Sequence, residues 1–162
     1  MTPPAARTAR VEKVAAALRR AGLDAPILPL RENTATAALA AAALGCEVGE
    51  IAKSLMFRRV SDDAPVLAVL SGAARADVKK LSAAAGGEVR KADAAFVKAK
   101  TGFEIGGVPP LGHDCAPTTV MDCGLLRHSR VWAAAGSAFA VFPSAPSALA
   151  AAAAAVVADI AE

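Results

Sequence analysis

The sequence lacks most of the patterns that assign a familiar chemistry. Its three cysteines, Cys46, Cys115 and Cys123, show no CxxC spacing, which favours a reducing cytosol over a disulfide framework. There is no GxSxG elbow, and the Gly-rich stretch 101–112 lacks the GK[ST] ending of a Walker loop. A Pro-Pro pair stands there in place of the helix start that a dinucleotide fingerprint needs. The sequence therefore offers no conventional nucleophile and no nucleotide-phosphate loop.

Long apolar segments are also missing. The N-terminal MTPPAARTARVEK has no apolar h-region, so we expect no secretory signal. The apolar run 149–157 is about half of the ~20 residues that span a bilayer, and Asp159 and Glu162 follow it. We expect a cytoplasmic protein without a membrane partner, ending in a packed helix from about Pro146 to Ile160.

Aromatic residues are scarce, at 4% of the chain, while alanine alone supplies about half of the 55% that is hydrophobic. A chain of 162 residues can still bury a core, and it fits a single domain over residues 1–162. The net charge of +3 and the pI near 9.0 permit an RNA partner. The basic residues are dispersed, however, so most of them are expected on solvated faces.

The hydrophobic period alternates between helical and extended along the chain. Thr34 or Thr36 can cap a helix that Gly45 closes, and the turn 61–65 predicts a hairpin. Strands mixed with helices, without regular βαβ alternation, predict an α+β fold. The expected helices cover 7–21, 36–44, 74–85, 92–100 and 146–160, with a helical turn at 48–52; the expected strands cover 53–60, 66–71, 88–90, 118–122, 130–135 and 138–142.

Two candidate sites emerge from the residues themselves. His113, Cys115, Cys123 and His128 are potential zinc ligands, but their spacing is not a usual one, and such cysteines are more often small apolar residues. Lys53 stands where a helical turn becomes an apolar strand. There its ammonium can bind a phosphate or carboxylate as a point charge, or it can simply extend to solvent.

Four segments in order give the chain a resemblance to a known family. They are RENTATAALAAAALGCEVGEIAKSL, PVLAVLSGAARADVKKL, TGFEIGGVPPLGH, and VMDCGLL followed by AAGS. The third resembles a TG-x(3)-GG-x-x-PLG loop. Together they resemble the YbaK/prolyl-tRNA synthetase editing-domain family of aminoacyl-tRNA deacylases, over nearly the whole chain.

This resemblance implies a central mixed β-sheet flanked by helices, and hydrolysis of the ester that joins a wrong amino acid to tRNA. The tRNA is typically that for proline, and the amino acid small, such as Cys, Ala, Ser or Thr. Lys53 would engage the 3′ end of the tRNA, and the loop Gly106–Pro110 would hold the aminoacyl group. No cofactor or metal is implied, and an aminoacyl-tRNA synthetase is a potential partner.

The loop chemistry suits that reaction. Backbone N–H groups of Gly106, Gly107 and Val108 can stabilise an oxyanion, while Pro109 and Pro110 fix the turn. The predicted substrate-binding residues are Ser54, Pro109, Pro110, Gly112 and His113. Two alternatives stay open: a non-catalytic module that binds a tRNA end or an amino acid beside a synthetase, and a zinc hydrolase that uses His113 and the cysteines.

Overall fold

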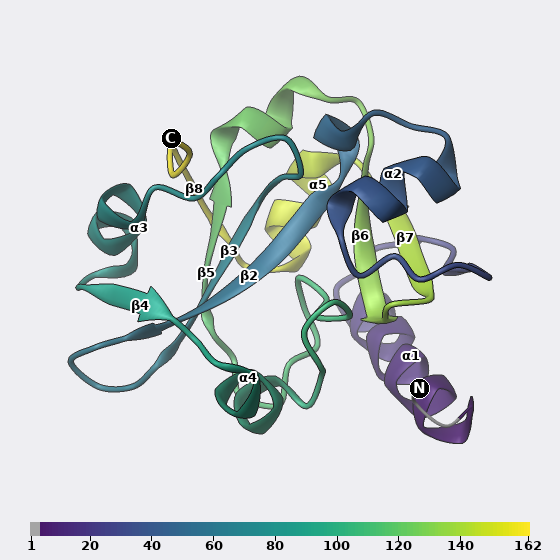
Figure 1. Cartoon of the computed structure of the whole chain (residues 1–162), viewed down its shortest axis with the longest axis horizontal. Helices are drawn as coiled ribbons and strands as arrows, with labels where there is room; N and C mark the ends of the chain where they lie inside the picture. The colour runs from purple at the N-terminus through teal and green to yellow at the C-terminus, as the bar shows by residue number, and fades with distance from the viewer. Residues whose placement is uncertain (1–3) are drawn as a thin grey trace.

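The computed structural model describes the backbone of residues 4–162 and the side chains from residue 9 onward. Residues 1–3, the start of the segment expected to carry no secretory signal, lie outside the described residues. Within the described part, the strands form two sheets, one of five strands and one of three (Figure 1). The predicted α+β fold with a central mixed sheet flanked by helices is confirmed.

The large sheet has the order β4-β2-β3-β5-β8. Strands β2 (Ala52–Arg59) and β3 (Pro65–Ser71) form the predicted hairpin, and β4 (Val89–Lys91) pairs antiparallel with β2. Strands β5 (Thr118–Asp122) and β8 (Val156–Ala158) continue the sheet in parallel. The sheet is therefore mixed, antiparallel on one side of β3 and parallel on the other.

Strand β3 lies at the centre of the core, and all seven of its residues are buried. Because side chains alternate between the faces of a strand, Val66, Ala68 and Leu70 pack toward α3 (Val78–Ala85). Leu67 and Val69 point the other way, into a cluster shared with α1 (Pro4–Arg20), α4 (Ala94–Thr101) and α5 (Pro146–Ala152). A strand buried on both faces explains the continuous apolar run 66–70.

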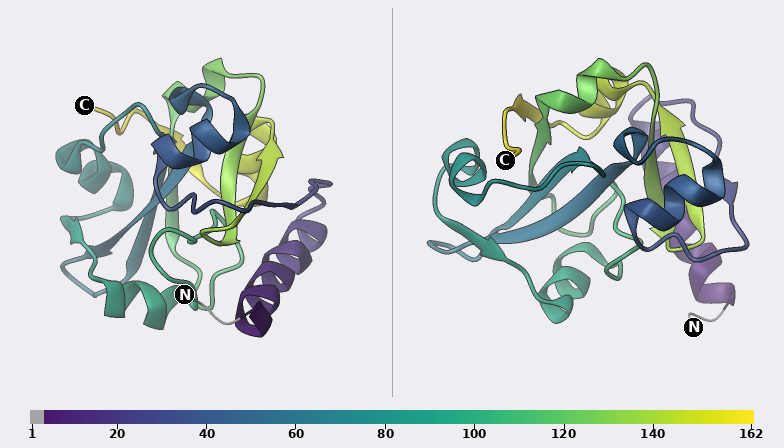
Figure 2. Two further views of the ribbon diagram at one scale, coloured as in Figure 1. Left: turned by 45° about the vertical axis from the view of Figure 1, so that its right-hand side comes forward. Right: turned by 45° about the horizontal axis from the view of Figure 1, so that its top comes forward.

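The small sheet has the order β1-β7-β6, with β1 (Leu28–Pro29), β6 (Val131–Ser137) and β7 (Ala140–Ser144) all antiparallel. Helix α2 (Ala37–Leu44) covers one of its faces through Ala40 and Ala41, which pack with Trp132 and Val141. Helix α1 covers the other face (Figure 2). The Thr36 hydroxyl accepts from the Leu39 N–H and caps α2, as one of the two predicted caps.

The prediction of a C-terminal helix over 146–160 is correct as far as Ala152 and wrong beyond it. Helix α5 ends at Ala152, and the chain then forms β8, in which Val156 and Val157 pair with Val120 and Met121 of β5. β-Branched residues favour a strand where a partner edge is available. The helix predicted over 74–85 also begins later, at Val78, because the carboxylate of Asp77 accepts from the N–H groups of Lys79 and Lys80.

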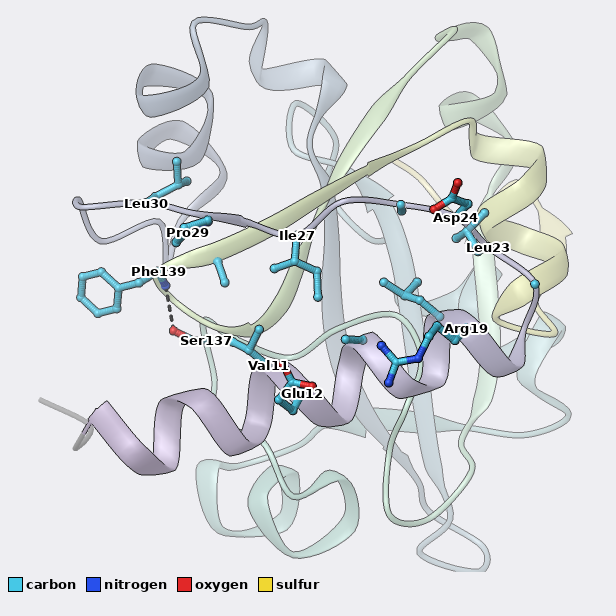
Figure 3. Close-up of a pocket in the computed structure, with 15 residues that line it drawn as sticks. Val11, Glu12, Arg19, Leu23, Asp24, Ile27, Pro29, Leu30, Ser137 and Phe139 are labelled. Atoms are coloured by element: carbon cyan, nitrogen blue, oxygen red, sulfur yellow. Dashed lines mark hydrogen bonds between the residues drawn. The ribbon is translucent and has the colours of Figure 1, made fainter.

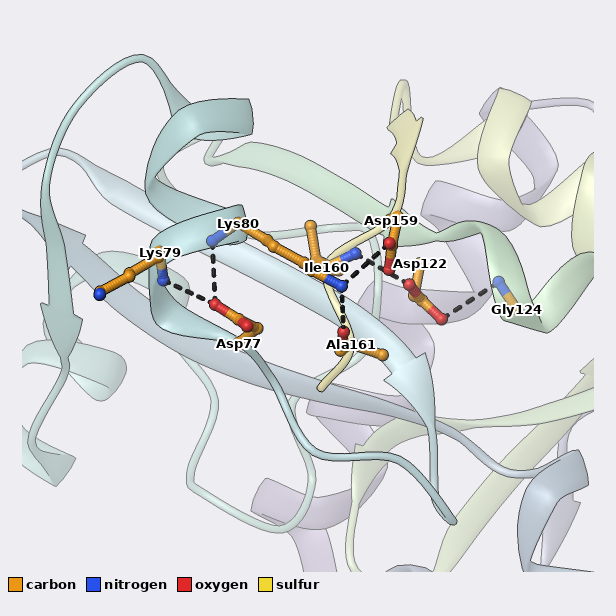
Figure 4. Close-up of polar contacts among 8 residues, drawn as sticks. All are labelled: Asp77, Lys79, Lys80, Asp122, Gly124, Asp159, Ile160 and Ala161. Carbon is orange, nitrogen blue, oxygen red and sulfur yellow. Dashed lines mark hydrogen bonds and ion pairs between the residues drawn. The ribbon is translucent and has the colours of Figure 1, made fainter.

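The segment after β8 is tied down by polar contacts (Figure 4). The buried Asp122 accepts from the Ile160 N–H at 3.0 Å and from the Gly124 N–H at 3.1 Å. Lys80 Nζ binds Asp159 at 3.0 Å and the Ala161 carbonyl at 2.8 Å. These contacts hold the C-terminal residues against α3 and the end of β5.

Two short 3₁₀ helices complete the chain, η1 (Val48–Glu50), within the helical turn expected at 48–52, and η2 (Cys123–Arg127), which the sequence did not predict. No helix among the described residues combines the length and the apolar character needed to cross a bilayer.

Candidate active site

A cavity of about 240 Å³ lies where α2, the start of β2, the loop before Pro109 and the small sheet meet. Lys53, Ser54, Gly106 and Val108, four of the predicted site residues, line it together. Its remaining walls are Thr34, Ala35, Thr36, Ala37, Ala40, Ile51, Ala52, Leu55, Ile105, Trp132, Ala133, Ala134 and Val141. Apart from Lys53 and the indole of Trp132, the polar side chains among these described lining residues are hydroxyls, so the described lining contains no carboxylate, imidazole or thiol.

Lys53 is the second residue of β2, opposite Leu70 of β3, and its side chain is half-buried. Its Nζ donates to the Ala74 carbonyl, and no carboxylate among the described residues pairs with it. Burial lowers the pKa of Lys53 below its ordinary value, and the nearby charge of Arg75 lowers it further. An unpaired, partly desolvated cation at a cavity wall is suited to binding an anionic or strongly polar ligand.

Ser54 follows Lys53 on the same strand. Its hydroxyl oxygen is buried and has no hydrogen-bond partner among the described residues. An unsatisfied buried hydroxyl costs about 1–3 kcal/mol. Ser54 is a lining residue of the cavity, but its hydroxyl oxygen is shielded from solvent.

The glycines of the loop allow very close packing. Gly106 has a φ of 94°, and a Cβ built on it would lie 2.8 Å from the Ala35 Cβ. A Cβ on Gly107 would lie 2.9 Å from the Ser137 backbone. Any side chain at either position would push the loop away from its neighbours, which explains why both positions are glycine.

The loop presents fewer free donors than the sequence predicts. The Gly107 N–H donates to the Glu104 carbonyl at 3.0 Å, and Gly107 does not line the cavity. The N–H groups of Gly106 and Val108 make no hydrogen bond to the described residues. The structure thus leaves two of the three predicted oxyanion donors available, and gives Gly107 a packing role.

The predicted substrate-binding residues after Val108 are not part of the cavity lining. Pro109 and Pro110 are buried. Gly112 packs on α1, where a Cβ would lie 3.1 Å from the Ala17 Cβ. The His113 Nε2 donates to the Pro109 carbonyl at 2.6 Å, and its ring meets Phe103 edge-on at 6.3 Å. These residues hold the shape of the loop.

The sequence missed the residues that close the cavity. The Thr34 hydroxyl and N–H both donate to the Ala138 carbonyl, at 2.7 and 2.6 Å. Ile51 forms an isolated β-bridge with Trp132. Trp132 is the one tryptophan of the chain, and Arg130 lies over its ring at 5.0 Å. Such contacts join distant segments, and the only local signal for them was the rarity of tryptophan itself.

The zinc alternative lacks a ligand set. No three His, Cys, Asp or Glu side chains of the described residues gather closely enough to hold a metal ion. Cys115 and Cys123 are exposed, and His113 is engaged by Pro109.

A larger cavity, of about 950 Å³, opens between α1, the segment 22–30 and the turn from β6 to β7 (Figure 3). Val11, Ile27 and Phe139 are among its lining residues, with Glu12, Arg19 and Asp24 as its charged groups. None of the predicted site residues lines it. Ser137, which lines this cavity, also carries the backbone against which Gly107 packs.

The fold is that of a single α+β domain, and its small cavity is lined by one lysine and by two loop residues whose N–H groups make no hydrogen bond to the described residues. The sequence profile of the aminoacyl-tRNA editing domain matches residues 31–152. The chain therefore belongs to the aminoacyl-tRNA editing domain family, as the resemblance to the YbaK group implied.

Individual relatives agree with this assignment. The uncharacterized protein YwhH of Bacillus subtilis (strain 168) is 38% identical over 105 residues, which span 65% of this chain and 66% of that protein. The crystal structure of a candidate trans-editing enzyme for prolyl-tRNA synthetase is 37% identical, with a TM-score of 0.88 over 100% of this chain and 99% of the other. The hypothetical protein APE2540 is 33% identical, with a TM-score of 0.86 over 93% of this chain and 99% of its own.

Proposed function

We propose that this protein is a trans-acting aminoacyl-tRNA deacylase, which hydrolyses the ester of a tRNA charged with a wrong, small amino acid. The observation that supports the proposal is the cavity of about 240 Å³ whose lining includes Lys53, which has no carboxylate partner among the described residues, together with Gly106 and Val108. Family membership supports an editing role, and the structural relative described as acting with prolyl-tRNA synthetase makes the tRNA for proline the first substrate to test. A protein with this substrate is proposed to act in the cytoplasm.

Ester hydrolysis in this cavity would require few catalytic groups from the protein. Water adds to the ester carbonyl, the bond to the ribose oxygen breaks, and that oxygen takes up a proton as the tRNA leaves. The Gly106 and Val108 N–H groups would stabilise the oxyanion that forms between these steps, a contribution of about 3–4 kcal/mol per donor in other enzymes. Because the lining holds no carboxylate or imidazole, the neighbouring ribose hydroxyl is proposed to position the water.

The walls of the cavity fit a small side chain. Ala37, Ala40 and Ala134 leave a narrow space, which Ile51 and Trp132 close. Alanine, cysteine, serine and threonine differ by one heavy atom or two, and such differences are worth only about 1–3 kcal/mol in an apolar pocket. We therefore propose overlapping activity on these four amino acids and not one exclusive substrate.

A panel of mischarged tRNAs tests the proposal. tRNA for proline charged in turn with alanine, cysteine, serine, threonine and proline is incubated with the protein, and ester loss is followed on the labelled terminal adenosine. At least one of the four small amino acids should be released faster than proline. Binding without cleavage of any of them would favour the non-catalytic module.

A variant at Lys53 tests the site itself. Lys53→Ala removes the only cation among the described residues of the cavity lining, so we expect kcat/KM to fall by about 100-fold or more, the scale of losing a charged transition-state contact. Lys91→Ala is the matched control, because Lys91 is an exposed lysine far from the cavity. Its backbone pairs in the sheet with Phe57, near the end of β2 that is opposite to Lys53. Full activity of Lys53→Ala, with an unchanged Tm, would contradict the assigned site.

A further inference from the structure

Lys53, which lines the small cavity, has a second cation near it, Arg75. The segment that follows β3 carries Ala74, whose carbonyl accepts from Lys53 Nζ, and Arg75 is the next residue. Arg75 is close enough for its charge to depress the pKa of Lys53, although burial is the larger cause. The segment reaches the cavity wall at Gly72, where a Cβ would lie 2.6 Å from the Ala37 Cβ.

The backbone of Arg75 is held firmly in place. Ala76 forms a β-bridge with Ala161, and the Asp77 N–H donates to the Ile160 carbonyl at 2.8 Å. The Glu162 N–H donates to the Arg75 carbonyl at 2.9 Å. Figure 4 shows the neighbouring contacts that anchor this end of the chain to α3 and β5. The position of Arg75 is thus fixed without the help of its own side chain.

The guanidinium, by contrast, is free to change partner. Its side chain is 89% exposed, and its ion pair with Glu162, at 3.4 Å, involves a carboxylate that is 58% exposed. Exposed pairs of this kind contribute about 0–1 kcal/mol, so an incoming anion can replace Glu162 at small cost. Lys53 has no carboxylate partner among the described residues. The pair of cations therefore carries positive charge that the protein itself hardly neutralises.

We propose that Arg75 binds a backbone phosphate of the single-stranded tRNA 3′ end, while the terminal aminoacyl ester lies in the small cavity beside Lys53. This inference rests on the proposed function and adds a phosphate contact to it. A planar guanidinium with several N–H donors matches a phosphodiester in two-point contact. Every nucleotide before the terminal one carries such a group, so a strand that enters the cavity brings phosphate to its mouth.

The first test compares two esters of the amino acid that the panel shows to be released fastest. One is the full aminoacyl-tRNA, and the other is the aminoacyl ester of adenosine, which has no phosphate. Arg75→Ala should lower kcat/KM about tenfold on the tRNA, through KM, and leave the adenosine ester unchanged. Arg90→Ala is the matched control, because Arg90 is an exposed arginine paired with Glu88, in β4 at the far end of β2. An equal loss on both esters would overturn the phosphate contact.

The second test measures binding and does not depend on hydrolysis. The affinity for an uncharged RNA hairpin ending in CCA is followed over a series of salt concentrations. The slope of log affinity against log salt should become shallower by about 0.7 in Arg75→Ala, the value for one phosphate contact on a single strand, and should be retained in Arg75→Lys. An unchanged slope in Arg75→Ala overturns the inference even if deacylation is confirmed. If the wild type cleaves no mischarged tRNA, the proposed function fails, and the slope still decides the role of Arg75.

Discussion

The small sheet separates two cavities that differ in both size and chemistry. Ala140 faces the larger, of about 950 Å³, while its neighbour Val141 faces the smaller, of about 240 Å³. The larger cavity has apolar walls with charges at Glu12, Arg19 and Asp24. The smaller one is lined by a lysine that has no ion pair among the described residues, and by Gly106 and Val108, whose N–H groups make no hydrogen bond to those residues. Unsatisfied polar groups in the lining, more than open volume, therefore mark the candidate active site.

The contrast between the two cavities can be tested by filling each one with a larger side chain. These substitutions have the largest expected effect among those that compare the two regions. Ala134 lines the small cavity and Ala15 the large one, and both are partly buried. Ala134→Leu should lower kcat/KM on mischarged tRNA by tenfold or more, because the added carbons occupy the space of the aminoacyl group. Ala15→Leu should stay within twofold of the wild type. Steady-state kinetics on the same tRNA measure both, and a larger loss for Ala15→Leu would move the site to the other cavity.

A comparison of two glycines tests whether the position of the loop matters for activity. Gly106 and Gly86 both have positive φ, 94° and 80°, but only Gly106 has a close neighbour, Ala35. Alanine at either position costs about 1–2 kcal/mol of backbone strain, which lowers Tm by roughly 2–8 °C in a chain of this size. Gly106→Ala should in addition lower kcat/KM about fivefold, because it displaces a lining residue. Equal activity of the two variants would show that the loop position does not matter.

The smallest expected effect is a pH dependence of the free energy of unfolding that comes from His113. Burial lowers the pKa of His113, and this outweighs the hydrogen bond to the Pro109 carbonyl, which raises it. The unfolded chain therefore takes up a proton first, near the ordinary value of about 6.5. The stability from neutral His113 is fully present above that pH and is lost as the pH falls toward the lowered folded pKa.

Thermal unfolding between pH 7.5 and pH 5 measures this effect. His113→Gln should show a smaller fall in Tm across the range than the wild type, because its amide does not titrate. His128→Gln removes the other of the two histidines and keeps His113, so it should fall as the wild type does. A fall in His113→Gln as steep as that of the wild type would assign the dependence to other groups.

The fold could be predicted wherever its signals were local. The cap at Thr36, the hairpin of β2 and β3 and the helix that ends before Gly86 follow from residues a few positions apart. The strand β8 could not be predicted in this way. Its Val156 and Val157 continue an alanine-rich helix in sequence, and only the free edge of β5, more than thirty residues earlier, makes them a strand.

The candidate site can be compared with the sequence only as far as its lining. Lys53, Ser54, Gly106 and Val108 line one cavity, and their roles stay predictions. The engagement of the Gly107 N–H by Glu104 and the support of Pro109 by His113 depend on the path of the loop. The closing wall of Ile51 and Trp132 depends on a bridge between the two sheets. Local sequence contains none of this geometry.

The contact between Glu162 and Arg75 also has a practical consequence for handling the protein. A purification tag or fusion partner attached after Glu162 begins at the residue whose N–H and carboxylate both contact Arg75. An acidic tag there would compete for the Arg75 guanidinium with the RNA phosphate that we propose to bind it. Kinetic measurements on this protein are therefore best made with nothing appended after Glu162.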